Sequence, residues 1–380
     1  MLMVYRLKNL AEMAAEAGLE MAGVAPAAAP PRLRALLQRR LDEGRVTPFE
    51  EGDPARRVDA AGLLPGCRSI IVVAMALPCT GEESPAPAAG PRGLVARCAR
   101  GPDYHLLLAS RAKRLLAMIA EKLPAAPAAR ILVDRSPLVE RELARLAGLG
   151  WIGENCTLIT PSAGSYAALG TILLDRALEE SAPLPQGCLA CGRCREACPT
   201  GALREPYILD PYRCLSYITQ APGIVPAEMR PLMGARLYGC DLCQEVCPHN
   251  AALPAEGGTK EQPAPFSFFP AQPLLEPILQ MTRKEFDCTV GLTAAGWRGK
   301  SILQRNAVIA LGNSGDSDAV PALAHVLKRD SRPLLRLHAA WALGRIGGSR
   351  ARRSLELQLQ RETEPAVIAE LRQALKQPGP

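Results

Sequence analysis

Eight cysteines in the middle of this 380-residue chain have the spacing of iron–sulfur ligands. The first run, from Cys188 to Pro199, reads C-x2-C-x2-C-x3-C-P, and the second, from Cys240 to Pro248, reads C-x2-C-x3-C-P. In bacterial ferredoxins the first spacing wraps three thiolates around one [4Fe–4S] cluster and directs the fourth to a second cluster. The second run lacks one cysteine, and Cys214 from the preceding loop is its natural substitute.

The crossed ferredoxin rule divides these ligands into two sets of four. One cluster is expected on Cys188, Cys191, Cys194 and Cys247. The other is expected on Cys198, Cys214, Cys240 and Cys243. Zinc is the alternative, but zinc prefers separated C-x2-C pairs in sets of four ligands. The isolated cysteines are expected to be small buried hydrophobic residues: Cys67, Cys79, Cys98, Cys156 and Cys288.

Two adjacent clusters form a path for electrons, so another part of the chain should hold an acceptor. Asp134 follows a short strand predicted at residues 131–133, and open α/β sheets bind ligands at the carboxyl ends of their strands. Ser136 and Pro137 already suit the N-cap and the first position of the next helix. Asp134 is therefore not needed as a cap, although a turn-forming role for it stays open.

His105 is a second candidate for chemistry. The chain has only 4 histidines, and this one follows Asp103 and Tyr104 at a predicted helix start. A solvated histidine in the first turn of a helix is the commoner outcome, and it is the one that we expect here.

The glycines from Gly148 to Gly153 match the pattern G-x-G-x-x-G of dinucleotide sites. Here the pattern follows a predicted helix and leads into a predicted strand, which is the reverse of the order in a dinucleotide site. We therefore reject an NAD site. The glycines are expected to permit a turn and a close approach of the backbone to a flat or bulky group.

Residues 1–180 have the pattern of an α/β domain. The continuous apolar run at 69–77 predicts a strand buried on both faces, and residues 167–174 predict another strand. Helices are predicted at residues 7–17, 32–43, 104–122 and 137–147. The proline-rich stretch 254–277 predicts a surface loop.

The C-terminal part contains an internal repeat. Residues 306–312 realign with residues 338–344 at an offset of 32, and Gly315 realigns with Gly347. Paired helices at this period indicate a short α-solenoid of the HEAT type, which should pack on the rest of the protein because two repeats bury little surface. A pair of ordinary alanine-rich helical hairpins is the alternative.

The repeat region is also basic. Between residues 291 and 353 there are 11 Lys or Arg residues and three Asp. A solenoid with one basic face could bind nucleic-acid phosphates, although a solvated helix exterior is the alternative. The expected RNA contacts are Arg298, Lys300, Arg305, Arg332 and Arg336.

These observations predict a multidomain α/β plus α protein. The predicted parts are an α/β catalytic domain (1–180), a ferredoxin-like domain with two clusters (181–252), a proline-rich connector (253–289) and a HEAT-like repeat domain (290–380).

The composition is that of a globular protein, with 48% hydrophobic and 22% charged residues and a net charge of +7. The longest apolar run, residues 70–78, is far shorter than the ~20 residues of a membrane helix. The N-terminal stretch carries charges throughout and reads as an amphipathic helix, not a signal peptide. We therefore expect a cytoplasmic monomer without a membrane partner, whose cysteines are not disulfides.

Several segments resemble the epoxyqueuosine reductase family. The similar segments are Val133-Asp134, Leu146 to Gly153 with Asn155, Gly239 to Gln244, Val246 to Pro248, Trp297 to Lys300, and Arg305 to Ala307. With the double cysteine run, the resemblance covers nearly the whole chain. Members of this family catalyse the last step of queuosine synthesis on transfer RNA, in which an epoxide on the modified wobble base is reduced to the alkene.

The resemblance implies an N-terminal domain that binds cob(II)alamin, two [4Fe–4S] clusters fed by an unidentified electron donor, and a HEAT-like domain that helps to hold the RNA. It implies that Asp134 is the proton donor. The residues that it places near the cobalamin are Arg57, Asp134, Asn155 and Ser216. A poor alkoxide leaving group needs a general acid, and Asp134 could serve as this acid only if burial beside the corrin raises its pKa towards neutrality.

The chain departs from the family pattern at three positions. The family usually has Lys where this chain has Glu154, an aromatic residue in place of Cys98, and Trp in place of His249. Glu154 reverses a charge beside the expected cofactor pocket, which puts any contact of that Lys in doubt. The other two differences are expected to be tolerated changes in packing.

Two other functions stay open. One is a reductase of a small molecule with the same cofactors, resembling reductive dehalogenases, but such a substrate needs no basic repeat surface. The other is an iron–sulfur electron-transfer protein without a substrate of its own, for which the large α/β domain would be unnecessary.

Overall fold

The computed structural model describes residues 3–77, 90–251 and 269–376. They divide into two compact units. The first unit comprises Met1–Gly81, Asp103–Arg213 and Leu242–Ala264, and the second comprises Glu82–Pro102, Cys214–Asp241 and Pro265–Pro380. Cys79 and much of the predicted proline-rich loop lie outside the described residues. The boundaries predicted near residues 180, 252 and 289 stay a prediction.

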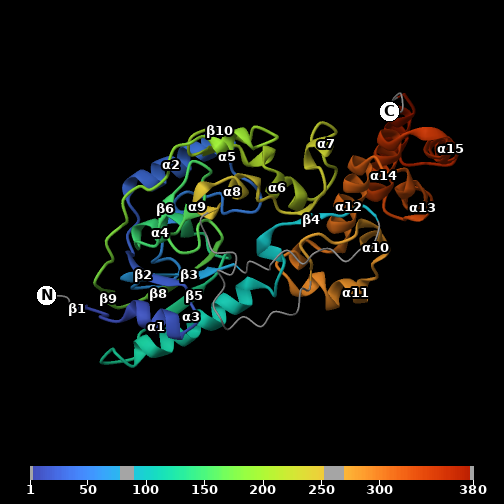
Figure 1. Ribbon diagram of the computed structural model, residues 1–380. Helices are drawn as coiled ribbons and strands as arrows, with labels where there is room; N and C mark the ends of the chain where they lie inside the picture. Colours follow the sequence, from blue (N-terminus) through green and yellow to red (C-terminus); the bar gives the residue numbers. More distant parts are fainter. Residues whose placement is uncertain (1–2, 78–89, 252–268, 377–380) are drawn as a thin grey trace. The chain divides into compact units, whose positions relative to one another are not determined.

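The first unit is built on a four-stranded sheet in the order β2-β3-β8-β5, in which all neighbouring strands are antiparallel (Figure 1). The strands are β2 (Met21–Pro26), β3 (Ser69–Ala76), β5 (Ala129–Leu132) and β8 (Ala167–Leu174). Every residue of β3 is buried, which confirms the prediction of a strand covered on both faces.

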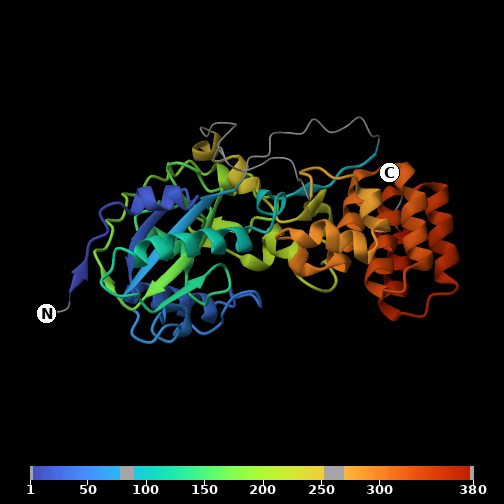
Figure 2. The same cartoon turned by 90° about the horizontal axis from the view of Figure 1, so that it is seen from below.

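Helices cover both faces of this sheet. The side chains of Ile71 and Val73 pack with α1 (Leu10–Glu16) and α3 (Tyr104–Ala120) on one face, and Figure 2 shows α3 running across the strands. The alternate side chains Ile70 and Val72 pack with α4 (Glu140–Leu146) on the other face. This alternation with a period of two is what allows one strand to serve two cores.

Helix α4 begins later than predicted. The N-cap of α4 is Val139, so Ser136 and Pro137 lie in the loop before the helix and the predicted cap is wrong. The Ser136 hydroxyl instead accepts a hydrogen bond from the backbone N–H of Leu138, at 3.0 Å. This local turn competes with helix formation at these positions.

The remaining elements of the first unit are short. They are β1 (Val4–Tyr5), α2 (Pro31–Asp42), β6 (Trp151–Ile152), β7 (Leu158–Ile159), β9 (Ala177–Leu178), α5 (Arg193–Glu196), β10 (Leu203–Glu205), β11 (Ile208–Leu209), α8 (Leu242–Glu245) and α9 (Pro248–Ala251), with 3-10 turns at Arg56–Val58 and Pro211–Arg213. Helices α5 and α8 contact each other and carry the cysteine-rich segments.

The second unit is mostly helical. Its elements are β4 (Leu94–Val95), α6 (Leu215–Gln220), α7 (Arg230–Met233), β12 (Arg236–Tyr238), α10 (Leu275–Gln280), α11 (Arg283–Cys288), α12 (Lys300–Ser314), α13 (Val320–Arg329), α14 (Pro333–Ile346), α15 (Gly348–Leu359) and α16 (Pro365–Lys376), with 3-10 turns at Arg97–Ala99, Val290–Leu292, Gly296–Arg298 and Ser317–Ala319. β4 and β12 pair in parallel.

The predicted repeat is visible in the packing of these helices. A Cβ atom on Gly312 of α12 would lie 2.7 Å from the Cβ of Ala342 in α14. The glycine one repeat later, Gly344, is related in the same way to Ala374 of α16, at 2.6 Å. These two glycines let successive helices approach closely, which gives the offset of 32 residues a physical cause.

Arg305 and Asn306 attach the first repeat helix to α6 within the second unit. The guanidinium of Arg305 donates hydrogen bonds to the carbonyls of Ala221 and Gly223, at 2.7 and 2.8 Å. The side-chain amide of Asn306 donates to the carbonyl of Thr219, at 2.7 Å. These groups satisfy carbonyls at the C-terminal end of α6, which a helix otherwise leaves unpaired.

Two further expectations can be compared with the described residues. Among residues 3–77, 90–251 and 269–376, no helix is both long enough and apolar enough to cross a membrane. Of the isolated cysteines, Cys67, Cys98 and Cys156 are half-buried. Cys288 is exposed, which contradicts the expectation that it is buried.

Candidate active site

Asp134 lies directly after β5, in the loop that leads to α4. Its φ angle of +55° is in the left-handed region, which Asp tolerates better than most residues. The Tyr104 hydroxyl donates a hydrogen bond to Asp134 Oδ2 at 2.6 Å, and His105 Nε2 lies 3.2 Å from the same oxygen. The side chain of Asp134 is 55% exposed, so a substrate could reach it.

His105 bridges two carboxylates and is not a solvated first-turn residue, so the expectation for it is wrong. Its Nδ1 lies 2.5 Å from Oδ1 of Asp103, and its Nε2 faces Asp134. Asp103 is also the N-cap of α3, because it accepts a hydrogen bond from the His105 backbone N–H. The sequence signal for a hydrogen bond between these two side chains was an N-cap Asp followed two residues later by His.

Both ring nitrogens of His105 face carboxylates, which favours the doubly protonated ring. Burial opposes a charge on this ring, but the hydrogen bonds to Asp134 and Asp103 outweigh it, so the pKa of His105 is raised. The hydrogen bond from His105 lowers the pKa of Asp134 against the effect of burial, and the Tyr104 hydroxyl lowers it further. Among the described residues, the partners of Asp134 therefore outweigh its burial, and a rise of this pKa beside a bound corrin stays a prediction.

Glu140 is the carboxyl group at this site whose pKa is raised. It is the first residue of α4, and its Oε1 accepts a hydrogen bond from the backbone N–H of Asp134 at 3.1 Å. Burial, with a contribution from the nearby Asp134 carboxylate, raises the pKa of Glu140 to about 8. Glu140 thus holds the backbone of Asp134, while burial disfavours a negative charge on its own side chain.

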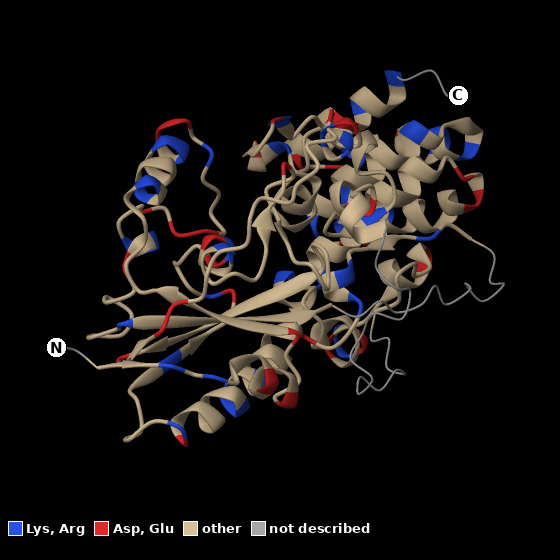
Figure 3. Ribbon diagram, turned by 60° about the vertical axis from the view of Figure 1, so that its left-hand side comes forward, with Lys and Arg blue, Asp and Glu red and all other residues tan. Residues whose placement is uncertain are grey.

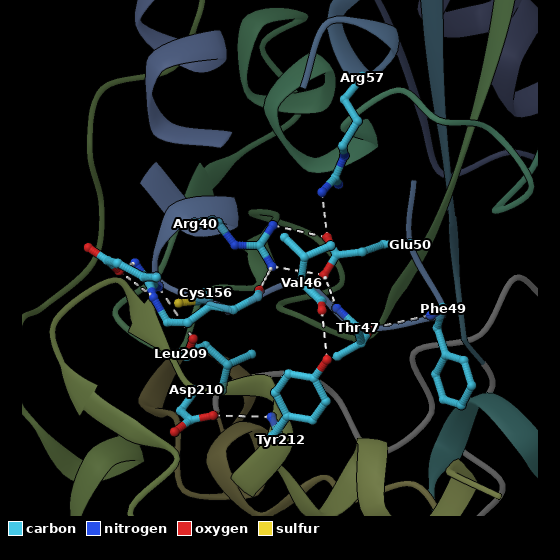
Figure 4. A network of polar contacts seen from close by, with 12 residues as sticks. Arg40, Val46, Thr47, Phe49, Glu50, Arg57, Cys156, Leu209, Asp210 and Tyr212 are labelled. Carbon is cyan, nitrogen blue, oxygen red and sulfur yellow. Dashed lines mark hydrogen bonds and ion pairs between the residues drawn. The ribbon is translucent and has the colours of Figure 1, made fainter. Parts of the chain in front are cut away.

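Arg57 lies in a separate polar network of the first unit (Figure 4). Glu50 accepts hydrogen bonds from both Arg57 and Arg40, and the distances to Arg40 are 2.9 and 3.0 Å. Burial lowers the pKa of Arg57, although the Glu50 carboxylate opposes this. The Nε of Arg57 is buried and has no hydrogen-bond partner among the described residues.

Asn155 also keeps a buried donor free. Its Oδ1 accepts hydrogen bonds from the backbone N–H and the hydroxyl of Thr157, at 3.2 and 2.8 Å. This fixes the orientation of the amide, and Nδ2 is left without a partner among the described residues. Ser216 belongs to the second unit, on α6, where its hydroxyl oxygen accepts a hydrogen bond from Gln220 at 3.4 Å.

The first predicted set of cysteines lines a single cavity in the first unit. The lining includes Cys188, Cys191, Cys194 and Cys247 together with Glu154 and Asn155. Burial raises the pKa of the Cys194 thiol, and the Glu154 carboxylate raises it further. Four thiols around one cavity are the donor set of a [4Fe–4S] cluster. The second predicted set divides between the units, with Cys198 and Cys243 in the first and Cys214 and Cys240 in the second.

The glycine run packs closely against neighbouring segments of the chain. Gly148 has a φ angle of +75° in the turn after α4, which confirms the predicted turn. A Cβ atom on Gly150 would lie 2.1 Å from the carbonyl oxygen of Ile159 in β7. The close approach of this run to a flat or bulky group stays a prediction.

The five expected RNA contacts all have partners within the second unit. Arg305 is 1% exposed, and its guanidinium donates hydrogen bonds to backbone carbonyls. The prediction that Arg305 contacts RNA is therefore wrong. Arg336 pairs with Glu362, and Arg332 pairs with Asp330. Arg298 and Lys300 are half-buried and each donates to one backbone carbonyl. Figure 3 shows acidic and basic residues interspersed on the repeat helices.

Comparison with protein families gives three matches. Residues 57–135 match the family model described as "Epoxyqueuosine reductase QueG". Residues 187–250 match the 4Fe-4S double cluster binding domain, which confirms iron–sulfur clusters over zinc as the interpretation of the cysteine run. Residues 299–376 match HEAT repeats, which confirms the predicted solenoid.

Individual proteins are similar over most of the chain. The epoxyqueuosine reductase of Bacillus cereus is 40% identical over 294 residues, which are 77% of this chain and 76% of the relative. A crystal structure of epoxyqueuosine reductase with an epoxyqueuosine-modified tRNA-Tyr stem loop has a TM-score of 0.88 at 34% identity and covers 97% of each chain. A Bacillus subtilis structure, described with its Asp134 catalytic loop swung out of the active site, also has a TM-score of 0.88 at 34% identity and covers 97% of this chain and 98% of that chain.

Proposed function

Because the chain belongs to the epoxyqueuosine reductase family, and is thus an epoxyqueuosine reductase with a 4Fe-4S double-cluster domain, we propose that it acts on the wobble base of transfer RNA and uses cobalamin. The observation that carries the proposal is Asp134, held by Tyr104 and His105 at the end of β5. The tRNA stem loop in the related crystal structure supports the RNA substrate.

The reaction balances with two electrons and two protons. The epoxide loses its oxygen as water, and its two carbons become the alkene of queuosine. The clusters supply the electrons one at a time, and we propose that the cavity cysteines Cys188, Cys191, Cys194 and Cys247 hold one cluster while Cys198, Cys214, Cys240 and Cys243 hold the other. Cobalamin, when bound and reduced, supplies the low-potential cobalt chemistry that opens the epoxide.

The residues of the first unit fit a corrin with amide side chains. Arg57 Nε and Asn155 Nδ2 are buried donors without partners among the described residues, and buried donors are rarely left unpaired. Such donors match the carbonyl oxygens of a cobalamin. We propose that Arg57, Asn155 and Ser216 hold the cofactor and that Asp134 lies beside it.

Asp134 and His105 act together in the proposed proton transfer. The pKa of Asp134 is lowered and that of His105 is raised, which favours the imidazole over the Asp134 carboxylate as the place of a shared proton. His105 passes this proton to Asp134, which touches the epoxide oxygen and protonates it as the first C–O bond breaks. His105 then takes a second proton from solvent, and the same path delivers it to the resulting hydroxyl, which leaves as water when the second C–O bond breaks. The Asp134 catalytic loop named for the Bacillus subtilis structure supports this role.

The pH dependence of turnover tests the role of His105. The imidazolium is present below the raised pKa of His105 and is lost as pH rises through it, so turnover of the parent should fall on that alkaline limb. His105→Gln should lower turnover about tenfold or more at neutral pH and should lose this limb. Exposed His325 provides the matched control, since His325→Gln should keep the parent profile. An unchanged limb in His105→Gln would remove His105 from the proton path.

RNA binding by the start of the repeat module is the next expectation. We propose that Arg298 and Lys300 approach RNA phosphates, because these two half-buried cations open the repeat module. Arg298→Gln with Lys300→Gln should weaken binding of the stem loop and reduce the salt dependence by about two counterions. Lys328→Gln with Arg329→Gln, at exposed positions of α13, makes the same charge change as a control. If only the control variant bound the stem loop more weakly, the RNA-binding surface would be on α13 and not at Arg298 and Lys300.

The cofactor set can be tested without substrate. Anaerobically purified protein, reconstituted with iron and sulfide, should contain about eight iron atoms per chain. It should bind added cobalamin with a cob(II)alamin signal in EPR. Protein with full clusters that does not bind cobalamin would instead be an electron-transfer protein.

A further inference from the structure

Glu154 is a buried carboxylate in the lining of the cysteine cavity. Its side chain is only 7% exposed, and it shares this lining with Cys188, Cys191, Cys194 and Cys247. It follows β6 and Gly153, and its carbonyl accepts a hydrogen bond from the backbone N–H of Tyr207 at 3.2 Å. The backbone around this carboxylate is therefore held in place.

The charged neighbour of Glu154 is Arg195. Arg195 Nε lies 3.4 Å from Glu154 Oε2, and Arg195 is on α5, between two cysteines of the first run. Neither of these two atoms makes a hydrogen bond among the described residues. The two side chains attract each other as charges, but no hydrogen bond joins these two atoms. Each charge is therefore only partly compensated by the other and still contributes to the electrostatic potential in the cavity.

A cluster in this cavity would interact electrostatically with both Glu154 and Arg195. One-electron reduction adds a negative charge to a [4Fe–4S] cluster, and the reduction potential depends on the net charge nearby. A carboxylate in the cavity lining opposes that added electron, whereas a guanidinium favours it. Burial strengthens the effect of Glu154 because water screens it less, whereas the Arg195 side chain is 36% exposed and its charge is screened more.

We propose that Glu154 and Arg195 set the reduction potential of the cluster held by Cys188, Cys191, Cys194 and Cys247, with Glu154 lowering it and Arg195 raising it. This inference rests on the proposed assignment of that cluster. The electron comes from an external one-electron reductant. Glu154 is thus proposed as a tuning residue of the cluster.

Opposite shifts in two variants provide the test. Holoprotein would be titrated with dithionite and redox mediators, and the EPR signal of the reduced cluster would be followed. Glu154→Gln, which keeps the size of the side chain, should raise the ratio of reduced to oxidised cluster roughly fivefold at a fixed potential. Arg195→Gln should lower the ratio by a smaller factor, because its side chain is 36% exposed, and the double variant should lie between the two single variants.

Glu196 offers a matched control on the same helix. It is exposed, so Glu196→Gln removes the same charge where water screens it and should change the ratio less than twofold. An unchanged ratio in Glu154→Gln, or a shift of the same sign in Arg195→Gln, would overturn the tuning role. Arg195 is partly exposed, so Arg195→Gln should fold even if Glu154→Gln does not. The proposal then requires a lowered ratio of reduced to oxidised cluster in Arg195→Gln alone.

Two measurements distinguish a wrong tuning role for Glu154 and Arg195 from a wrong assignment of the cluster ligands. Iron content and the reduced-cluster signal would be measured in every variant. A parent protein without a reducible [4Fe–4S] signal would contradict the assignment. A parent with this signal, and variants with unshifted ratios, would contradict the tuning role alone.

Discussion

Asp134→Ala should lower the rate of epoxide reduction by about 10²–10⁴-fold, which is the usual contribution of a positioned acid. An alkoxide is a poor leaving group, so the reaction needs a proton at the oxygen as the bond breaks. Tyr104 and His105 orient the Asp134 carboxylate toward this task. The rate is best measured in a single turnover with a modified stem loop, so that product release does not hide the chemical step.

Arg135 supplies a control from the same loop. It is exposed, and Arg135→Ala should keep most of the turnover. Cobalamin binding and iron content should be the same in Asp134→Ala as in the parent, because the variant removes a proton path and not a cluster ligand. Parent-like turnover in Asp134→Ala would exclude Asp134 as the acid.

Cys247→Ala should abolish steady-state turnover, because electrons would no longer pass through the first cluster. Cys247 comes from the second cysteine run and lines the cavity formed by the first run. A cluster that loses one thiolate ligand of four is expected to be lost or degraded. Iron content should fall from about eight to about four atoms per chain.

Cys156 provides the control for this change. It is a half-buried cysteine of the first unit that belongs to neither predicted set. Cys156→Ala should keep full iron content and turnover. If Cys247→Ala retained eight iron atoms and its activity, the crossed assignment of the cavity cysteines would be refuted.

Features encoded by short-range spacing were predictable from the sequence. The cysteine runs predicted the cluster domain because ligand spacing in a short loop is set by the size of the cluster. The repeat offset predicted the solenoid because Gly312 and Gly344 recur where helices must approach closely. The buried strand at 69–77 was predictable because its apolar run leaves no polar face.

Features that depend on distant partners were not predictable. Arg305 looked like an RNA contact because no local pattern shows that the carbonyls after α6, more than eighty positions away, will accept its hydrogen bonds. Arg336 was predicted to contact RNA because its partner, Glu362, lies beyond the basic segment 291–353. The hydrogen bond from His105, which lowers the pKa of Asp134, was not predictable either, because the two residues are 29 positions apart in the sequence.

The central claim is that this chain reduces epoxyqueuosine in RNA with cobalamin as a required cofactor. The most direct test is to incubate reconstituted protein anaerobically with an epoxyqueuosine-modified stem loop and a one-electron reductant, with and without cobalamin. The RNA would then be digested and its nucleosides weighed by mass spectrometry. The account predicts conversion to queuosine, with the loss of one oxygen atom, only when cobalamin is present. Unchanged epoxyqueuosine with fully loaded protein, or equal conversion without cobalamin, would contradict it.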